Sequence, residues 1–354
     1  MTVSIECHVL LEQVTAHRAA KPGEIRAFSV CRNERLRLPA FLSHYRGLGV
    51  DEFFIIDNDS SDGSTDYLAA QPDVHLFRTT NRFSEAKYGT QWLNAVLAEF
   101  GVGFWCVTVD IDELLVYPGS EHAALRALTA HFDRHGYEAL CCLLLDLYPA
   151  RPLDECPYAP GDDLIDAAPF FDATPYRTAP VDFCPGFMVM GGMRERVFHP
   201  DFRDRGLSTK IYAGVFNRLA RYAPILRETR WMRAHSPPSS PYLTKVPLVR
   251  WDEKSRYLKT NHGVSPKLVA PDTGVLLHFK FLHDFHARAV REAERGEHYN
   301  RASEYQRYAE TLSRDPQMTF MCDASVRFEG TSQLVRLGLM QETDAWLAAR
   351  AKPR

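Results

Sequence analysis

Two acidic residues separated by one position are the first candidates for chemistry, in the segment Val109 to Glu113 (V-D-I-D-E). Asp110 and Asp112 follow an apolar run, and side chains at i and i+2 of an extended backbone point to the same side. Their carboxylates could hold Mg²⁺ or Mn²⁺, and such a cation could neutralise a diphosphate. Acidic pairs at strand ends are often only solvated turn residues. The apolar residues on both sides of this pair favour a binding site.

A second polar cluster, D-N-D-S-S-D-G-S, follows another apolar run. Its first residue, Asp57, could accept hydrogen bonds from a ribose or a base edge, as the acidic residue of dinucleotide-binding folds does. The alternative is an Asx-turn that leads into a helix, with Ser60, Asp62 and Ser64 as caps. Both can hold at once.

A third cluster, C-R-N-E at Cys31 to Glu34, also follows an apolar run. Helix capping by Asn33 is the alternative to a binding role there.

Histidine and cationic side chains follow late in the chain. His278 comes directly after an apolar run, where it is either a buried core histidine or a metal ligand, and His262 is the alternative ligand. Lys280, Lys245 and Arg194 could meet phosphate charge, with ordinary surface salt bridges as the alternative.

The elements that would position these residues alternate between strand-like and helical patterns. Strands are expected at 25–31, 52–56, 74–77, 104–109, 139–147 and 274–277, and helices at 36–48 and 85–100. This rhythm predicts an α/β fold with a mostly parallel sheet flanked by helices. The polar clusters then fall at the carboxyl ends of strands, where such sheets bind ligands.

The second half of the chain differs from the first in its amino-acid composition. Eight prolines between Pro149 and Pro185 predict a largely irregular segment that lies on the surface or covers a site. A loop or linker is expected at 235–241 and a single solvated, highly charged helix at 284–312, for which a membrane-surface role is the alternative. The predicted division is 1–20 as an extension, 21–150 and 151–283 as two halves that share the site, and 284–354 as a helical region.

The composition excludes several classes of protein. The 354 residues carry 42 Lys and Arg against 45 Asp and Glu, and this balance argues against a general nucleic-acid binder. No signal peptide and no membrane-spanning run is visible, so a cytoplasmic protein is expected. The eight cysteines contain no C-x-x-C pair, and Cys31, Cys106, Cys141 and Cys142 are expected as buried free thiols.

The three clusters, taken together, resemble the glycosyltransferase family 2 type of GT-A fold. The matching segments are SVCRNE at 29–34, IIDNDSSDGSTD at 55–66 and VDIDELL at 109–115. The similarity covers roughly Ile25 to Tyr117 well and the rest loosely. More narrowly, the chain is similar to bacterial family 2 enzymes with D-x-D-E, a later G-G-x-R (here 191–194) and a late H-F-K (here 278–280).

The resemblance implies a donor site for a nucleoside diphosphate sugar. It makes 21–150 the nucleotide-sugar-binding half and 151–283 the acceptor-side half that completes the metal site. Its implied donor-binding residues are Arg32, Asn33, Glu34, Asp57, Asp59, Lys87, Asp110, Arg194 and Lys280. Asp57 would contact uracil or ribose, and Asp110 the ribose or the metal. Lys87 would contact the diphosphate, although the family's N-x-G-x-x-x-A-R-N stretch is replaced here by Asn81-Arg82 and residues 85–94.

The metal ligands implied are Asp110, Asp112 and His278, since GT-A enzymes often supply a histidine from the C-terminal half. An inverting transfer also needs a carboxylate base beside the acceptor hydroxyl. Asp146 and Glu195 are the candidates, with Asp182 as a weaker third, and each could equally be an ordinary surface or paired acid.

The expected function is therefore a metal-dependent inverting glycosyltransferase, in bacterial surface polysaccharide or glycoconjugate synthesis. Its partners would be a nucleotide sugar and a glycan or lipid-linked acceptor met at the inner face of the membrane, and no nucleic acid. A metal-dependent phosphohydrolase or nucleotidyltransferase is one alternative. A non-catalytic nucleotide-sugar-binding protein on the same scaffold is the other.

Overall fold

The computed structural model describes residues 2–5, 9–181, 183–200, 241–258 and 260–351. Three features of the sequence fall outside these ranges: Cys7, the candidate base Asp182 and all but the last residue of the loop expected at 235–241.

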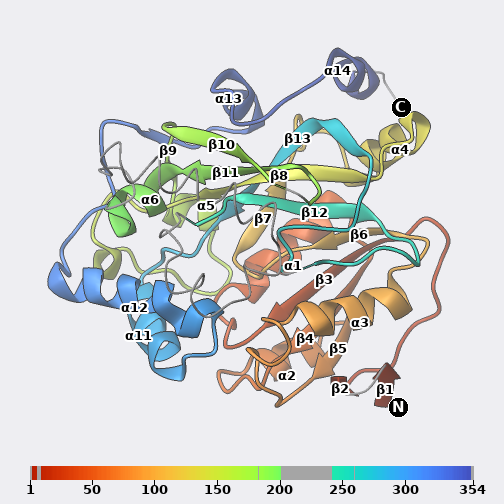
Figure 1. Ribbon diagram of the computed structural model, residues 1–354, viewed down its shortest axis with the longest axis horizontal. Helices are drawn as coiled ribbons and strands as arrows, with labels where there is room; N and C mark the ends of the chain where they lie inside the picture. Colours follow the sequence, from red (N-terminus) through yellow and green to blue (C-terminus); the bar gives the residue numbers. More distant parts are fainter. Residues whose placement is uncertain (1, 6–8, 182, 201–240, 259, 352–354) are drawn as a thin grey trace, which may run out of the picture.

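A large central sheet organises the described chain (Figure 1). Its ten strands are β1 (Thr2–Ile5), β2 (Val9–Gln13), β3 (Ile25–Cys31), β4 (Glu52–Asp57), β5 (Val74–Arg78), β6 (Trp105–Thr108), β7 (Glu113–Val116), β8 (Ala139–Asp146), β12 (Thr244–Arg250) and β13 (Val269–His278). In space their order is β1-β2-β5-β4-β3-β6-β12-β8-β13-β7. Only β2, β12 and β7 run against the others, so the prediction of a mostly parallel α/β sheet is confirmed.

Alternation along the strands builds one core on each face of this sheet. In β4, Phe53 and Ile55 face one core, whereas Phe54 and Ile56 face the other, as the two-residue period of a strand requires. Helices α1 (Leu38–Leu48) and α4 (Leu125–His135) pack into the first core, and α3 (Thr90–Phe100) packs into the second.

The strand β8 lies deep in the sheet, and all eight of its residues are buried. It pairs with β12 on one side and with β13 on the other, and both neighbours come from far later in the sequence. Cys141 and Cys142 on β8 are buried free thiols, as are Cys31 and Cys106, which confirms that prediction.

Two helix starts differ from the expectation. The helix predicted from residue 85 begins at Thr90, because Lys87 and Tyr88 adopt left-handed backbone angles (φ 48° and 57°) that a helix cannot contain. The helix predicted from residue 36 begins at Leu38, where a proline in the first turn suits a helix start.

The proline-rich segment contains only short elements among its described residues. They are η1 (Leu153–Glu155), α5 (Leu164–Ala167), β9 (Phe170–Asp172) and β10 (Tyr176–Pro180). β10 forms a hairpin with β11 (Phe187–Gly191), which leads into α6 (Gly192–Phe198), and β9 pairs with β14 (Ser325–Arg327).

The prediction of a single solvated helix at 284–312 is wrong. The segment forms two helices, α11 (Phe285–Arg295) and α12 (Tyr299–Arg314), because the chain turns at Gly296 with φ 66°. Their apolar residues are buried in a third core with Phe198 and Phe281 rather than solvated. Two further helices follow, α13 (Thr331–Arg336) and α14 (Asp344–Arg350), and none of the described helices is both long and apolar enough to cross a bilayer.

The four-part division of the chain stays a prediction. The central sheet takes strands from three of those parts, 1–20, 21–150 and 151–283.

Candidate functional site

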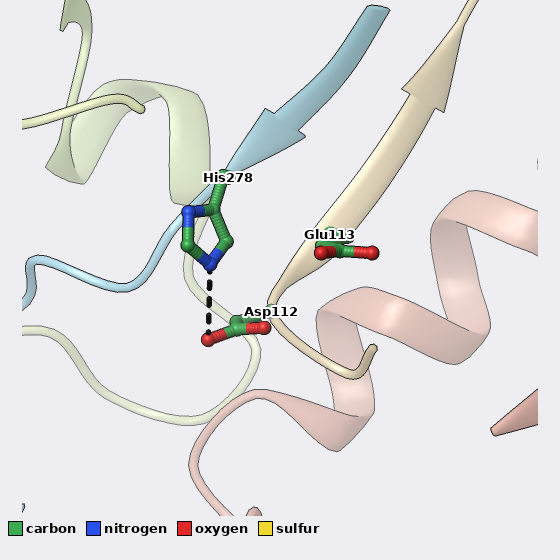
Figure 2. A group of neighbouring side chains, drawn as sticks. All are labelled: Asp112, Glu113 and His278. Carbon is green, nitrogen blue, oxygen red and sulfur yellow. Dashed lines mark ion pairs between the residues drawn. The ribbon is translucent and has the colours of Figure 1, made fainter. Parts of the chain in front are cut away.

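Strand register brings together residues that are far apart in the sequence. β13 pairs in parallel with β8 and antiparallel with β7, so that His278 lies opposite Asp146 on one side and opposite Glu113 on the other. Asp112 directly precedes β7, and Figure 2 shows its carboxylate facing the His278 ring. Asp112, Asp146 and His278, which the sequence analysis considered for separate roles, therefore lie together at one edge of the sheet.

His278 is held between two carboxylates. Its Nε2 lies 3.5 Å from Asp112 Oδ2, the ion pair that Figure 2 draws, and its Nδ1 lies 2.6 Å from Asp146 Oδ1. Arg194 Nε in turn donates to Asp146 Oδ2 at 3.1 Å. Metal-binding histidines usually have this arrangement, in which a carboxylate holds the ring nitrogen that faces away from the ion.

The charges of this group follow from its pairing. Burial alone would lower the pKa of His278, but Asp112 and Asp146 outweigh it and raise that pKa. Burial likewise opposes ionisation of the acids, yet His278 and the nearby arginines hold the pKa of Asp112 well below its usual range, and Arg194 and His278 hold that of Asp146 at about 2. Without a bound cation, the two carboxylates therefore favour the protonated form of the His278 ring.

Lys245 forms ion pairs with two acids of the V-D-I-D-E segment. Its ammonium is 2.7 Å from Asp110 Oδ2 and also donates to Glu113, and only 2% of its side chain is exposed. Asn261 donates to the other oxygen of Asp110 at 3.2 Å. Burial and the charge of Asp110 raise the pKa of Glu113 to about 7, against the effect of Lys245.

A divalent cation fits one group of three side chains among the described residues. Asp112, Glu113 and His278 each offer one ligand atom, and these atoms lie within 4.8 Å of one another. Two carboxylates and an imidazole suit Mn²⁺, or Mg²⁺ with water and phosphate oxygens completing the shell. Glu113 stands in this group where the sequence predicted Asp110, whose side chain is half exposed, and Lys245 pairs with both acids. The acid directly after D-x-D was the signal that could have indicated it.

His262, the alternative histidine, is not in that group. Its Nδ1 lies 2.8 Å from the carbonyl oxygen of Thr244. Burial and the neighbouring Lys245 lower its pKa to about 4.

The side chain of Asp57 builds the turn that follows β4. It is fully buried; Oδ1 accepts from the Ser60 amide at 3.2 Å, and Oδ2 accepts from the Thr65 hydroxyl at 2.5 Å. This is the Asx-type turn considered from the sequence. The helix that follows, α2 (Ser64–Ala69), has Gly63 at its N-cap and no side-chain cap, so the prediction of Ser60, Asp62 and Ser64 as N-caps is wrong. The contact of Asp57 with ribose or base stays a prediction.

The C-R-N-E loop packs against the same turn. Arg32 donates to the carbonyl of Asn58 at 2.7 Å and lies 4.0 Å from Asp59, while Asn33 accepts from the Ser61 amide at 2.8 Å. These contacts hold the loops that follow β3 and β4 side by side, as expected for the ends of neighbouring parallel strands.

Glu34 meets two arginines that the sequence analysis missed. Arg288 Nη2 donates to it at 2.5 Å, and Arg37 lies 3.5 Å away. Burial raises the pKa of Glu34 to about 7, although both arginines oppose the shift. Arg288 also lies 3.7 Å from Asp112. Nothing in a charged helix sequence marks which arginine turns inward, so only the tertiary contact identifies it.

The remaining predicted residues lie in different settings. Glu195 is 1% exposed, and both of its oxygens accept from Arg177 at 2.7 Å. Lys280 is buried with its ammonium 4.7 Å from the ring centre of Tyr305, a cation–π contact. Lys87 is exposed, in the left-handed turn before α3.

No protein-family model matches the chain, and no curated protein matches it. Among solved structures it is similar to a 4-diphosphocytidyl-2C-methyl-D-erythritol synthase, at 16% identity and a TM-score of 0.24 over 36% of this chain and 63% of that one. It is also similar to a UDP-glucose pyrophosphorylase from Acinetobacter baumanii, at 7% identity and a TM-score of 0.24 over 38% of this chain and 60% of that one. The matches thus span less than two thirds of either structure, and at these TM-scores they carry no argument about this chain.

Proposed function

We propose that the protein is a glycosyltransferase that moves a sugar from a nucleoside diphosphate donor to a hydroxyl acceptor. The observation that supports it most is the buried group of Asp112, Glu113 and His278 at the edge of the sheet, with Asp146 behind the histidine. Ligands of parallel sheets bind at this edge, and the loops that resemble the donor site of family 2 enzymes lie there too.

The donor diphosphate is proposed to lie against this group. Asp112, Glu113 and His278 would hold Mn²⁺ or Mg²⁺, which supplies positive charge to the leaving diphosphate. Asp110, fixed by Lys245 and Asn261, would accept from the ribose.

The transfer itself breaks the bond between the anomeric carbon and a diphosphate oxygen, which keeps the electron pair. The acceptor oxygen forms the new bond, and its proton passes to a carboxylate. Of the two candidate bases, Asp146 is better suited to positioning His278 than to accepting a proton, because a carboxylate with a pKa near 2 is weakly basic. Glu195 would have to exchange Arg177 for the acceptor hydroxyl.

The acceptor is proposed to be a glycan or a lipid-linked glycoconjugate. This part rests on the resemblance to bacterial family 2 enzymes alone, as does a place at the cytoplasmic face of the membrane.

Calorimetric titration with UDP and GDP, each with Mn²⁺ and with EDTA, tests the donor site. We expect at least one to bind, and more tightly with Mn²⁺. Asp112→Asn should lose the Mn²⁺-dependent gain, whereas Asp344→Asn, at an exposed position of α14, should keep it.

Product analysis with the nucleotide sugars of the nucleotide that binds then separates the activities. Sugar transfer or slow release of the sugar with the nucleoside diphosphate supports the proposal. Release of pyrophosphate or phosphate would favour the nucleotidyltransferase or phosphohydrolase instead. Binding without any turnover across a panel of glycan acceptors would favour the non-catalytic protein.

A further inference from the structure

One guanidinium nitrogen beside the candidate site has no acceptor. Arg288 uses Nη2 for its bond to Glu34, but its Nη1 is buried and has no hydrogen-bond partner among the described residues. The nearest acid, Asp112, lies 3.7 Å from that nitrogen, beyond hydrogen-bond distance. A buried donor without an acceptor is costly, so an absent acceptor is indicated there.

The surrounding contacts hold Arg288 in place. It lies on α11, whose Phe285 and Ala289 are buried in the third core. Asp284, at the start of that helix, pairs with Arg37 at 2.7 Å, and Arg37 Nε also donates to the carbonyl of Phe279 at 3.1 Å. The helix that carries Arg288 is thereby tied to the segment that follows His278. Because its guanidinium is already held in place, Arg288 would need little movement to bind a negatively charged group.

The chemistry of the missing acceptor follows from its neighbours. The unsatisfied N–H lies beside Asp112, a proposed cation ligand, and a guanidinium matches the oxygens of phosphate better than any other side chain does. A neutral acceptor could fill the gap, but a phosphate oxygen bridging the cation and Arg288 would satisfy both groups at once.

We propose that Arg288 is a diphosphate-binding residue, which donates from Nη1 to a phosphate oxygen of the nucleoside diphosphate beside Asp112. The inference rests on the proposed function and extends it: part of the affinity for the diphosphate comes from the chain itself and persists when the cation is removed.

The test uses the full-length protein and the variants Arg288→Met and Arg288→Lys, with Arg291→Met as the control, since Arg291 is exposed on the same helix. Dissociation constants are measured for UDP and GDP in EDTA, and for uridine and guanosine, which lack the diphosphate. We expect Arg288→Met to weaken binding of the diphosphate by about 10- to 100-fold in EDTA, the range for hydrogen bonds to charged groups. Nucleoside binding should change less than about twofold, Arg288→Lys should recover part of the loss because it keeps the charge, and Arg291→Met should resemble the wild type.

The outcomes separate the two proposals. If Arg288→Met weakens nucleoside and diphosphate binding equally, or leaves both unchanged, Arg288 is structural or uninvolved and this inference is overturned, although the donor site stands. If the wild-type protein binds neither UDP nor GDP with Mn²⁺ or with EDTA, the proposed function itself fails.

Discussion

Lys245 shows how strongly a single side chain can determine the charge of this site. Its ammonium is nearly inaccessible and pairs with both Asp110 and Glu113. From the sequence, the partner of this lysine could be either a phosphate or an acid on the surface. Its partners in the structure lie more than a hundred residues earlier in the chain.

Lys245→Met should destabilise the fold by about 3–5 kcal/mol, because it leaves the buried carboxylate of Glu113 without its cation. Urea denaturation at pH 7 measures the change. Lys254→Met, at an exposed position, is the control and should change stability by less than about 0.5 kcal/mol. An equally small effect of Lys245→Met would mean that the two acids do not depend on it.

Gly191, which precedes α6 and Arg194, is the second position where one residue decides the local structure. Its φ is 124°, and an added Cβ would lie 2.2 Å from the backbone oxygen of Pro175. Gly63 also has a positive φ, of 87°, but a Cβ there would meet nothing within 4 Å.

Gly191→Ala should therefore cost at least about 2 kcal/mol more than Gly63→Ala, which carries only the backbone strain of about 1–2 kcal/mol. Thermal and urea unfolding of the two variants give the comparison. Equal losses would show that the backbone around Pro175 moves aside freely.

At the scale of elements, the helical hairpin α11–α12 differs most from the sequence expectation. Its many charges suggested a solvated helix, yet each helix buries a stripe at helical spacing, Phe285 and Ala289 on α11 and Tyr305 and Tyr308 on α12. The stripes are narrow, and the charged residues beside them include Arg288, which faces the site rather than water. Charge alone could not distinguish these settings.

Glu292 links the two helices and gives this hairpin a pH dependence. It accepts from His298 at 3.0 Å and lies 3.4 Å from Arg295. Burial opposes its ionisation, but His298 and Arg295 lower its pKa to about 2. A depressed carboxylate pKa stabilises the fold above the ordinary value near 4.5, and this contribution is lost as the pH falls toward 2.

Glu292→Gln should accordingly cost about 1–3 kcal/mol at pH 7 and progressively less below pH 4.5. Urea midpoints of the wild type and the variant at pH 7, 4.5 and 3.5 provide the measurement. A difference that stays constant over this range would indicate that packing, and not charge, accounts for the loss.

At the scale of the whole molecule, local patterns predicted most of the parallel sheet and the edge at which its polar clusters meet. The strands at 25–31, 52–57 and 139–146 follow from apolar runs and turn residues close by in the sequence. The place of β12 between β6 and β8 does not, because it depends on packing between segments more than a hundred residues apart. Lys245 and Arg288 reach the site through such long-range contacts, so the metal group and its cations could be predicted only in part.

A fragment of residues 1–150 should fail to fold cooperatively, since β8 would lose both of its neighbours and expose its buried edges. Circular dichroism and urea titration of the fragment test this, with the full-length chain as reference. A sharp, reversible unfolding transition of the fragment would instead support 21–150 as an independent domain.

The position of β8 also bears on how the chain is made. The eight residues of β8 leave the ribosome well before β12, which begins about 100 residues later, and β13 follows β12. At about 5–20 residues per second, this apolar strand waits on the order of 5–20 s for its first partner. During that interval its unpaired edges are exposed to aggregation, and a chaperone would be expected to bind it.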